Sequence, residues 1–280
     1  MKRRFLSKAK IITFREHLIL EEKSEATIGK YMRDTIAFLT YTQGREITRK
    51  LVIAYKKQLQ DCYAARSVNS MLASLNSLFS FLHWHDLKLK SMKFQQPIYC
   101  SEEKELTKVE YMRLCKTAEL KKNRRLSLIL QTICGTGIRV SELRFVTVEA
   151  VRGNEITVDC KAKTRKVFIV KRLKQKLLRY AAEQGITEGM IFVTRTGKSV
   201  SRTNIWREMK SICQEAGVNS KKVFPHSLRH LFARVFYDME KDIAKLADIL
   251  GHSSINTTRI YIVSTGVKHR QQMEAMKLIL

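Results

Sequence analysis

The chain has 280 residues, 44% of them hydrophobic, which is enough for two folded domains and argues against a disordered protein. No apolar run approaches the roughly 18 residues that a membrane span needs, and no apolar signal core follows the basic amino terminus. A soluble, cytoplasmic protein is therefore the expectation from the sequence.

The charge balance is strongly basic. Lys and Arg total 53 against 26 acidic residues, for a formal net charge of +27. Residues 1–100 hold 18 basic and 8 acidic residues and residues 101–280 hold 35 and 18, so both parts are cationic. Neutralised phosphates release condensed counterions, so such a charge favours nucleic acid. No basic amphipathic anchor favours a membrane surface instead. We therefore expect a protein that binds DNA or RNA.

The cysteines are scattered and contain no C-x-x-C pair, which is the close spacing that zinc sites require. Most of them lie in apolar runs and are expected to be reduced, buried side chains. The sequence thus predicts no metal site and no cofactor. The six cysteines are Cys62, Cys100, Cys115, Cys134, Cys160 and Cys213.

Residues 1–93 have the periodicity of a small helical bundle. Apolar side chains recur at helical spacing in residues 27–41 and 68–85, and Ser24 and Ser67 precede these runs as expected helix caps. The periodicity ends around Pro97, so we expect a linker at residues 94–104.

A second domain is expected over residues 105–280. Thr107 and Glu110 form a capping-box pattern before a new helix, and residues 126–146 form an apolar helical stretch interrupted by Gly135 and Gly137. The expected architecture is mainly α, with a small β-sheet in this second domain.

The expected sheet comes from short β-rich runs. Residues 155–159 and 166–170 predict two strands of a hairpin with a basic loop at residues 160–165, and residues 190–194 predict a third strand. The rest is helical again, with Asp242 as a cap and Gly251 as a helix stop.

Three short segments carry polar residues that a core would not require. Arg139 lies within an apolar run, where a charge must be paired or functional; an ion pair with Glu142 is the simplest explanation. His226 and Arg229 share one helix face after Pro225 and could bind a phosphate oxygen together.

The third segment contains His252 after Gly251, and Tyr261 nine residues beyond that histidine. Taken alone, such a tyrosine would be an ordinary packing residue of an amphipathic segment. Each of the three signals is weak when it stands alone.

Together the segments resemble the tyrosine recombinase family, which includes phage integrases and the Xer and Cre recombinases. The sequence has GIRVSEL at 137–143, HSLRH at 226–230 and LGHSSINTTRIY at 250–261, in the family's order and at similar separations. The resemblance covers most of residues 105–265. The preceding helical domain is similar to the family's core-binding domain, which contacts DNA.

The resemblance implies a reaction and a site. Tyr261 would attack a DNA phosphodiester to form a 3′-phosphotyrosine and a free 5′-hydroxyl, without a metal ion, and strand exchange would pass through a Holliday junction in a tetramer on paired sites. The residues around the scissile phosphate would be Arg139, His226, Arg229 and His252.

The family also uses a lysine on a β-hairpin. Here Cys160 and Ala162 replace the usual glycines on either side of it, so Lys161 is the preferred residue and Lys163 stays open. By the same resemblance, Glu142 would orient the basic groups and His230 would have a structural role.

The carboxyl-terminal segment places four apolar residues on one helical stripe, which would either pack on its own domain or, as in many relatives, dock on a neighbouring subunit. These residues are Met273, Met276, Ile279 and Leu280.

Several alternatives stay open within and beyond the family. The recombinase could serve integration and excision of a mobile element, Xer-like resolution of chromosomes or plasmids, or a DNA inversion switch, with accessory DNA-bending or directionality proteins. A type IB topoisomerase, a catalytically silent DNA-binding regulator and a metal-dependent transposase are less favoured. The full Arg–His–Arg–His–Tyr set argues against the regulator, and the absence of an acidic constellation argues against the transposase.

Overall fold

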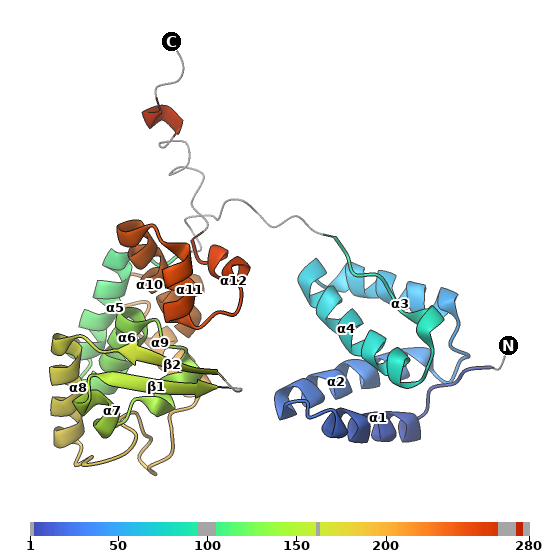
Figure 1. The fold of residues 1–280 in the computed structure, drawn as a ribbon, viewed down its shortest axis with the longest axis horizontal. Helices are drawn as coiled ribbons and strands as arrows, with labels where there is room; N and C mark the ends of the chain where they lie inside the picture. The colour runs from blue at the N-terminus through green and yellow to red at the C-terminus, as the bar shows by residue number, and fades with distance from the viewer. Residues whose placement is uncertain (1–2, 94–104, 161–162, 263–272, 277–280) are drawn as a thin grey trace. The chain divides into compact units, whose positions relative to one another are not determined.

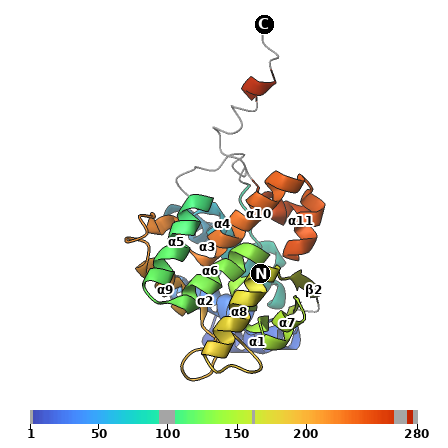
Figure 2. The same cartoon turned by 90° about the vertical axis from the view of Figure 1, so that its left-hand side faces the viewer.

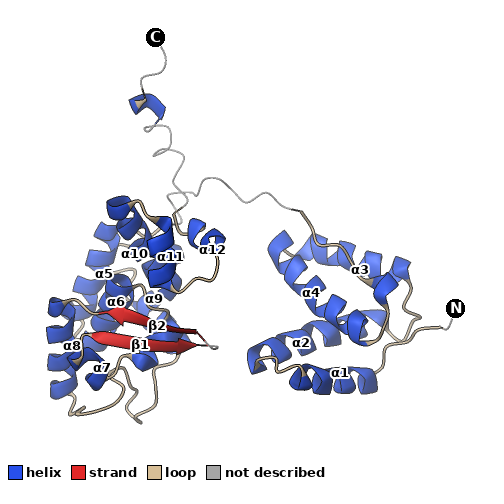
Figure 3. Ribbon diagram, viewed as in Figure 1, coloured by secondary structure: helices blue, strands red, loops and turns tan. Residues whose placement is uncertain are grey.

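The structure is a computed structural model, and it describes residues 3–93, 105–160, 163–262 and 273–276. The chain divides into two compact units, Met1–Gln96 and Pro97–Leu280 (Figure 1). The predicted fold class is confirmed, because helices dominate and the small sheet lies in the second unit (Figure 3). Within the described ranges, no helix combines the length and the apolar character that crossing a bilayer requires.

The first unit is a helical bundle, as the sequence predicts. Helix α4 packs against the three helices that precede it, and their apolar faces bury Phe14, Phe38 and Phe79 completely. The elements are α1 (Lys8–Leu20), α2 (Glu25–Thr42), α3 (Arg49–Cys62), α4 (Ala65–Phe81) and the short 3-10 helix η1 (His85–Leu87).

One of the two predicted helix caps in this unit is confirmed and the other is wrong. The Ser24 side chain accepts a hydrogen bond from the backbone N–H of Thr27 and caps α2. Ser67 lies inside the first turn of α4, whose cap position is Ala64. The helix therefore begins one turn earlier than the serine pattern predicts, without a side-chain cap, and Val68 in that turn is fully buried.

The second unit is built around α6, which packs against α5, α8, α9 and α10. Figure 2 shows α5, α6 and α10 close together. The helical elements are α5 (Lys108–Leu120), α6 (Arg124–Thr136), η3 (Val140–Phe145), α7 (Val148–Arg152), α8 (Lys171–Glu183), α9 (Arg202–Ser211), η4 (Ser220–Lys222), α10 (Pro225–Glu240), α11 (Ile243–Leu250) and α12 (Ile255–Arg259).

The helix boundaries that the sequence predicts in this unit are confirmed. Thr107 and Glu110 form both hydrogen bonds of a capping box at the start of α5. Pro225 is the first residue of α10, Asp242 caps α11, and Gly251 ends α11 in the left-handed conformation with φ 65°. These caps orient the ends of α10 and α11, where several predicted site residues lie.

The sheet is a two-stranded antiparallel hairpin in the described residues. Strands β1 (Glu155–Cys160) and β2 (Lys163–Phe168) pair from Glu155 opposite Phe168 to Cys160 opposite Lys163. The hairpin is confirmed, but residues 163–165, predicted to lie in its loop, belong to β2.

The predicted third strand at residues 190–194 is wrong. Met190 and Val193 form only isolated bridges, to Thr147 and Ser199. The run is apolar because Ile191 and Phe192 are buried in the core, not because it extends the sheet.

The apolar stretch that precedes the site is divided by a sharp change of direction. Gly135 remains within α6, whereas Gly137 ends the helix with φ 68°. A Cβ at Gly137 would lie 2.6 Å from Cδ1 of Phe232 on α10 and 3.0 Å from Cδ2 of Leu250 on α11. This close approach brings the segment with Arg139 against α10 and α11.

The carboxyl-terminal stripe is described only in part. Met273 and Met276 are 59% and 60% exposed, and Ile279 and Leu280 lie outside the described residues. A role of this segment in subunit contact therefore stays a prediction.

Replacing Gly137 by alanine should destabilise the protein by about 1–3 kcal/mol, because the new methyl group meets Phe232 and the backbone conformation is strained for any other residue. Gly135→Ala is the matched control: its Cβ would have ordinary contact with Leu173 at 3.9 Å, and it should be neutral or slightly stabilising. Urea unfolding of both variants measures the difference. Equal stability of the two variants would contradict the close packing at Gly137.

Candidate active site

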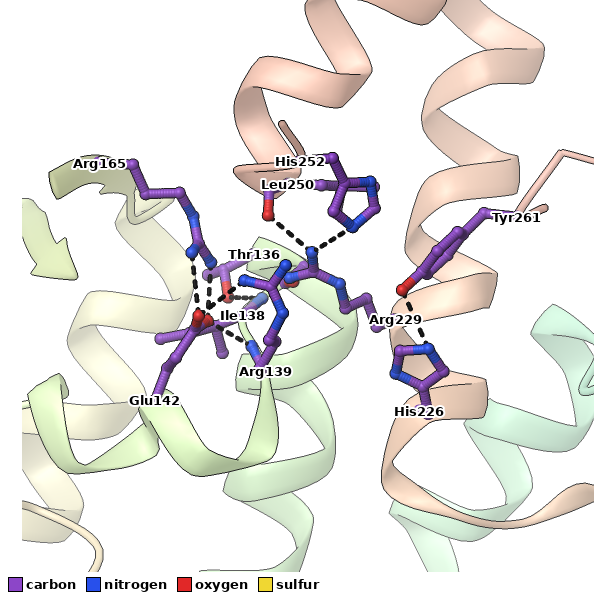
Figure 4. Close-up of polar contacts among 11 residues, drawn as sticks. Thr136, Ile138, Arg139, Glu142, Arg165, His226, Arg229, Leu250, His252 and Tyr261 are labelled. Atoms are coloured by element: carbon purple, nitrogen blue, oxygen red, sulfur yellow. Dashed lines mark hydrogen bonds and ion pairs between the residues drawn. The ribbon is translucent and has the colours of Figure 1, made fainter. Parts of the chain in front are cut away.

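Glu142 is a buried carboxylate that joins two arginines. It is 1% exposed, and it accepts hydrogen bonds from the backbone N–H of Arg139 at 2.7 Å and from Nη1 of Arg139 at 2.8 Å. Nη1 and Nη2 of Arg165 donate to its two oxygens at 3.0 and 2.7 Å (Figure 4). The predicted Arg139–Glu142 ion pair is confirmed, and a second arginine completes it.

The ionisation of Glu142 follows from these contacts. Burial by itself would raise the pKa of the carboxyl, but the hydrogen bonds from Arg165 and then Arg139 outweigh it and lower the pKa to about 2. Glu142 is therefore negatively charged at any physiological pH, and it can hold both guanidinium groups in place.

Arg229, from the first turns of α10, is 1% exposed and ties together the ends of two other helices. Its Nη1 donates to the carbonyl of Gly137 after α6, and its Nη2 donates to the carbonyl of Leu250 at the end of α11, at 2.6 Å. Burial, and next the positive charge of Arg139, lower the pKa of Arg229 to about 10. The two arginines are thus close enough to repel each other while both remain charged.

The contacts of His252 determine its tautomer. Nη2 of Arg229 lies 2.9 Å from Nε2 of His252, and a guanidinium only donates, so Nε2 is the acceptor. The ring proton is then on Nδ1, which donates to Oγ1 of the fully buried Thr258 at 2.8 Å. His252 is therefore a neutral imidazole held between Arg229 and α12.

Tyr261 is 5% exposed and lies among histidines of the same chain. Its hydroxyl is 2.9 Å from Nε2 of His226 on α10 (Figure 4). Its ring stacks on His230 with 4.2 Å between ring centroids, and it lies 5.1 Å from the His252 ring. The guanidinium of Arg229 lies 6.0 Å from the tyrosine ring centroid.

These histidines are uncharged at neutral pH. Burial is the main cause that lowers the pKa of His226, followed by the charges of Arg229 and Arg139. Burial also lowers the pKa of His230 and of His252 to about 4, with His226 and Arg229 respectively as the next cause. Among them, His226 is the ring whose nitrogen lies within hydrogen-bond distance of the Tyr261 hydroxyl.

These contacts do not decide which hairpin lysine, Lys161 or Lys163, belongs to the site. Lys161 lies outside the described residues, and Lys163 is described only as the first residue of β2, paired with Cys160. The choice between them stays a prediction. The other predicted site residues all lie in the cluster around Arg229 and Glu142.

Two members of the cluster were missed by the sequence analysis, Arg165 and Thr258. A signal for Arg165 exists, because the alternation of β2 puts it on the same face as the buried Val167, opposite the buried Val158 of β1. Thr258 lies in the LGHSSINTTRIY segment, but its contact with His252 depends on how α12 folds back.

No group of three His, Cys, Asp or Glu side chains suited to a metal ion occurs among the residues that the structure describes.

The lowered pKa of His230 makes the free energy of unfolding depend on pH. Because the folded pKa of His230 lies below the usual value of 6.5, the unfolded chain binds more protons between pH 6.5 and about 4, and stability falls as the pH falls through this range. His230→Phe keeps a ring stacked on Tyr261 and removes this loss, which is on the order of 3 kcal/mol. Urea unfolding at pH 7 and pH 4 measures it; an unchanged pH dependence in the variant would refute the assignment.

Comparisons with known proteins identify the family. The profile described as "Phage integrase family" matches residues 104–266, and that of "Phage integrase, N-terminal SAM-like domain" matches residues 11–86. The chain is similar to Tyrosine recombinase XerA of Pyrococcus horikoshii, with 30% identity over 276 residues that cover 95% of this chain and 93% of that protein. Tyrosine recombinase XerD of Staphylococcus haemolyticus is 26% identical over 278 residues, covering 89% and 91%.

Solved structures show the same fold. A crystal structure of XerA recombinase matches with a TM-score of 0.53 and 25% identity, covering 97% of this chain and 99% of that one. A lambda integrase dimer bound to a COC' core site matches with a TM-score of 0.75 and 18% identity, covering 93% and 78%. The family profile covers more than half of the chain, and the XerA similarity extends over nearly all of it. The chain therefore belongs to the phage integrase family and is a tyrosine recombinase, a site-specific DNA recombinase.

Proposed function

We propose that this recombinase cuts and rejoins one DNA strand at a time by attack of its own Tyr261 on a phosphate held between Arg139 and Arg229. The observation that carries the proposal is the 2.9 Å hydrogen bond between the Tyr261 hydroxyl and His226, beside a buried arginine. Any buried tyrosine hydroxyl needs a hydrogen-bond partner, but here the partner is a histidine, and the guanidinium of Arg229 lies 6.0 Å from the tyrosine ring centroid.

The charge of the cluster supports phosphate binding. Three guanidinium groups, those of Arg139, Arg165 and Arg229, face one carboxylate, that of Glu142, which leaves an excess of two positive charges beside neutral histidines. A phosphodiester under attack gains negative charge on its non-bridging oxygens. Fixed guanidinium groups stabilise that charge more than they stabilise the ground state. The Arg139 side chain is 36% exposed, so an incoming strand can reach it.

The proton transfers can be assigned to this chain's residues. Near neutral pH a tyrosine hydroxyl needs a base, and the neutral Nε2 of His226 can accept its proton. The Tyr261 oxygen forms a bond to phosphorus, the bond from phosphorus to the 5′-oxygen breaks, and Lys161 or Lys163 protonates the departing oxygen. The product is a 3′-phosphotyrosine, which keeps the bond energy for rejoining without a metal ion or a cofactor.

The remaining residues have supporting roles in this proposal. His252 accepts a hydrogen bond from Arg229 and holds that guanidinium beside the phosphate, Glu142 orients Arg139, and stacking of His230 on the tyrosine ring holds the nucleophile. Because Tyr261 lies among residues of its own chain, we propose attack by each subunit on the phosphate that it binds.

In the same proposal the two units have different roles. Residues 1–93 bind double-stranded DNA, residues 94–104 link the units, and residues 105–280 carry the chemistry, with basic charge in both parts. Four copies on paired sites would exchange strands through a Holliday junction; a lambda integrase tetramer bound to a Holliday junction has the same fold. The proposal also includes accessory DNA-bending or directionality proteins and association of the protein with the nucleoid.

The biological task has two favoured candidates. The similarity to proteins named XerA and XerD favours Xer-like resolution of chromosomes or plasmids. Cys160 and Ala162, in place of the glycines usual around the hairpin lysine, favour an integrase of a mobile element. An inversion switch would use the same chemistry on inverted sites.

Trapping on nicked DNA tests the reaction and finds the site together. The protein is incubated in excess EDTA with nicked, sheared genomic DNA of its host, and covalently attached ends are recovered after denaturation and sequenced. Ends that converge on one sequence are expected. Attachment at unrelated sequences, with relaxation of any supercoiled plasmid, would instead indicate a type IB topoisomerase, and no attachment would indicate a silent DNA-binding protein.

Tyr261→Phe should abolish covalent attachment and leave retention of DNA intact, because it removes only the attacking oxygen. The matched control is Tyr237→Phe. Tyr237 is a partly buried tyrosine on α10, and the variant should attach DNA at the rate of the unmodified protein. Attachment by Tyr261→Phe, or loss of DNA retention in it, would contradict the assignment of the nucleophile.

Arg139→Met should slow attachment on the order of 100- to 1000-fold, as expected for loss of one donor to the transition-state charge. Glu142 keeps its contacts with Arg165 in this variant, so the fold should survive. Single-turnover attachment to the nicked library and filter retention of DNA separate the two effects. An equal loss in both would place Arg139 in binding rather than in chemistry.

A further inference from the structure

We propose that Arg165 is a positioning residue of the recombination reaction, which fixes Glu142 and through it Arg139, and which joins the lysine-bearing hairpin to the site. The proposal rests on the function proposed above. Arg165 is not among the residues that the family motifs in the sequence identify.

The contact between Arg165 and Glu142 is bidentate. Nη1 donates to Oε1 at 3.0 Å and Nη2 donates to Oε2 at 2.7 Å, while the Arg165 side chain is 13% exposed. Two parallel bonds between planar groups determine the orientation of the carboxylate as well as its position. An ammonium group in the same place could not do this, because it acts as a point charge.

The orientation of Glu142 sets that of Arg139. The same two carboxylate oxygens accept the backbone N–H and Nη1 of Arg139, so the arginine is held at both its backbone and its guanidinium. Without Arg165 the carboxylate would be held only by Arg139 itself, so no second group would fix the position of the Arg139 guanidinium. A displacement of about 1 Å in a catalytic group can cost on the order of 100-fold in rate.

Arg165 also connects segments that are distant in the sequence. It belongs to β2, two residues after Lys163, whereas Glu142 belongs to η3. The contact therefore ties the hairpin that carries both candidate lysines to the segment that carries Arg139.

The turn before His252 is shaped around the same side chain. A Cβ at Gly251 would lie 2.6 Å from Cδ of Arg165 and 3.1 Å from its Nη1, and Gly251 has φ 65°. Arg165 therefore passes directly over the glycine that ends α11. The turn that places His252 beside Arg229 packs on the arginine that orients Glu142.

The test uses covalent attachment to the nicked genomic library, with protein in excess over DNA and below the unfolding temperature of each variant. Arg165→Met should slow attachment on the order of 100-fold while retention of DNA is unchanged. Arg165→Lys keeps the charge but loses the two-pronged contact, and its rate should lie between those of Arg165→Met and the unmodified protein. Lys166→Met is the matched control on the same strand, because Lys166 points to solvent and is 67% exposed, and it should react normally.

Two further variants separate positioning from a merely structural role. Gly251→Ala should slow attachment as well, because its methyl group displaces Arg165 without removing it. If Arg165 acts through Glu142, the double variant Glu142→Gln with Arg165→Met should be no slower than the slower single variant. Multiplied effects in the double variant would show an independent role of Arg165 and overturn the proposal.

The remaining outcomes are distinct. A normal rate of attachment in Arg165→Met, with only a lower unfolding temperature, would overturn the proposal and leave Arg165 as a structural brace. An equal loss of attachment and of DNA retention would make it a DNA-binding residue and overturn the proposal too. Failure of the unmodified protein to attach DNA would refute the proposed function itself, and the inference with it.

Discussion

The site depends on one buried carboxylate. Glu142 is 1% exposed and holds Arg139 and Arg165, and the positive charge of Arg139 in turn reaches Arg229. Without this negative charge, like-charged guanidinium groups would be forced together in a poorly solvated place. Glu142 compensates enough charge to let the cluster fold, and the remaining positive charge makes it receptive to a phosphate.

Two glycines make this crowding geometrically feasible. Gly137 and Gly251 end α6 and α11 in the left-handed conformation, and each lies where a Cβ would meet a neighbouring side chain. The carbonyls of Gly137 and Leu250 both accept from Arg229. The ends of two helices thus supply the acceptors that a buried guanidinium needs, since exposed carbonyls at helix ends lack partners within the helix.

Much of the site could be predicted because its chemistry is local in the sequence. The Arg139–Glu142 pair, the His226–Arg229 face and the caps at Asp242 and Gly251 each depend on residues within one or two helical turns. The errors arose where a local pattern has more than one explanation: Ser67 lies within the first turn of α4 and does not cap it, and residues 190–194 are apolar because Ile191 and Phe192 lie in the core. The contacts of Arg165 and Thr258 were missed, because each joins segments whose approach is decided by the fold.

The amino-acid sequence by itself determined the mainly helical two-domain class, the basic charge and the order of the family motifs, because these follow from composition, periodicity and short spacings. Only the tertiary structure decided that Tyr261 meets His226 and stacks on His230, that His252 is a neutral acceptor for Arg229, and that Arg165 completes the Glu142 cluster. These contacts join residues up to 35 positions apart, and no local preference specifies which of the available polar partners will meet once the helices pack.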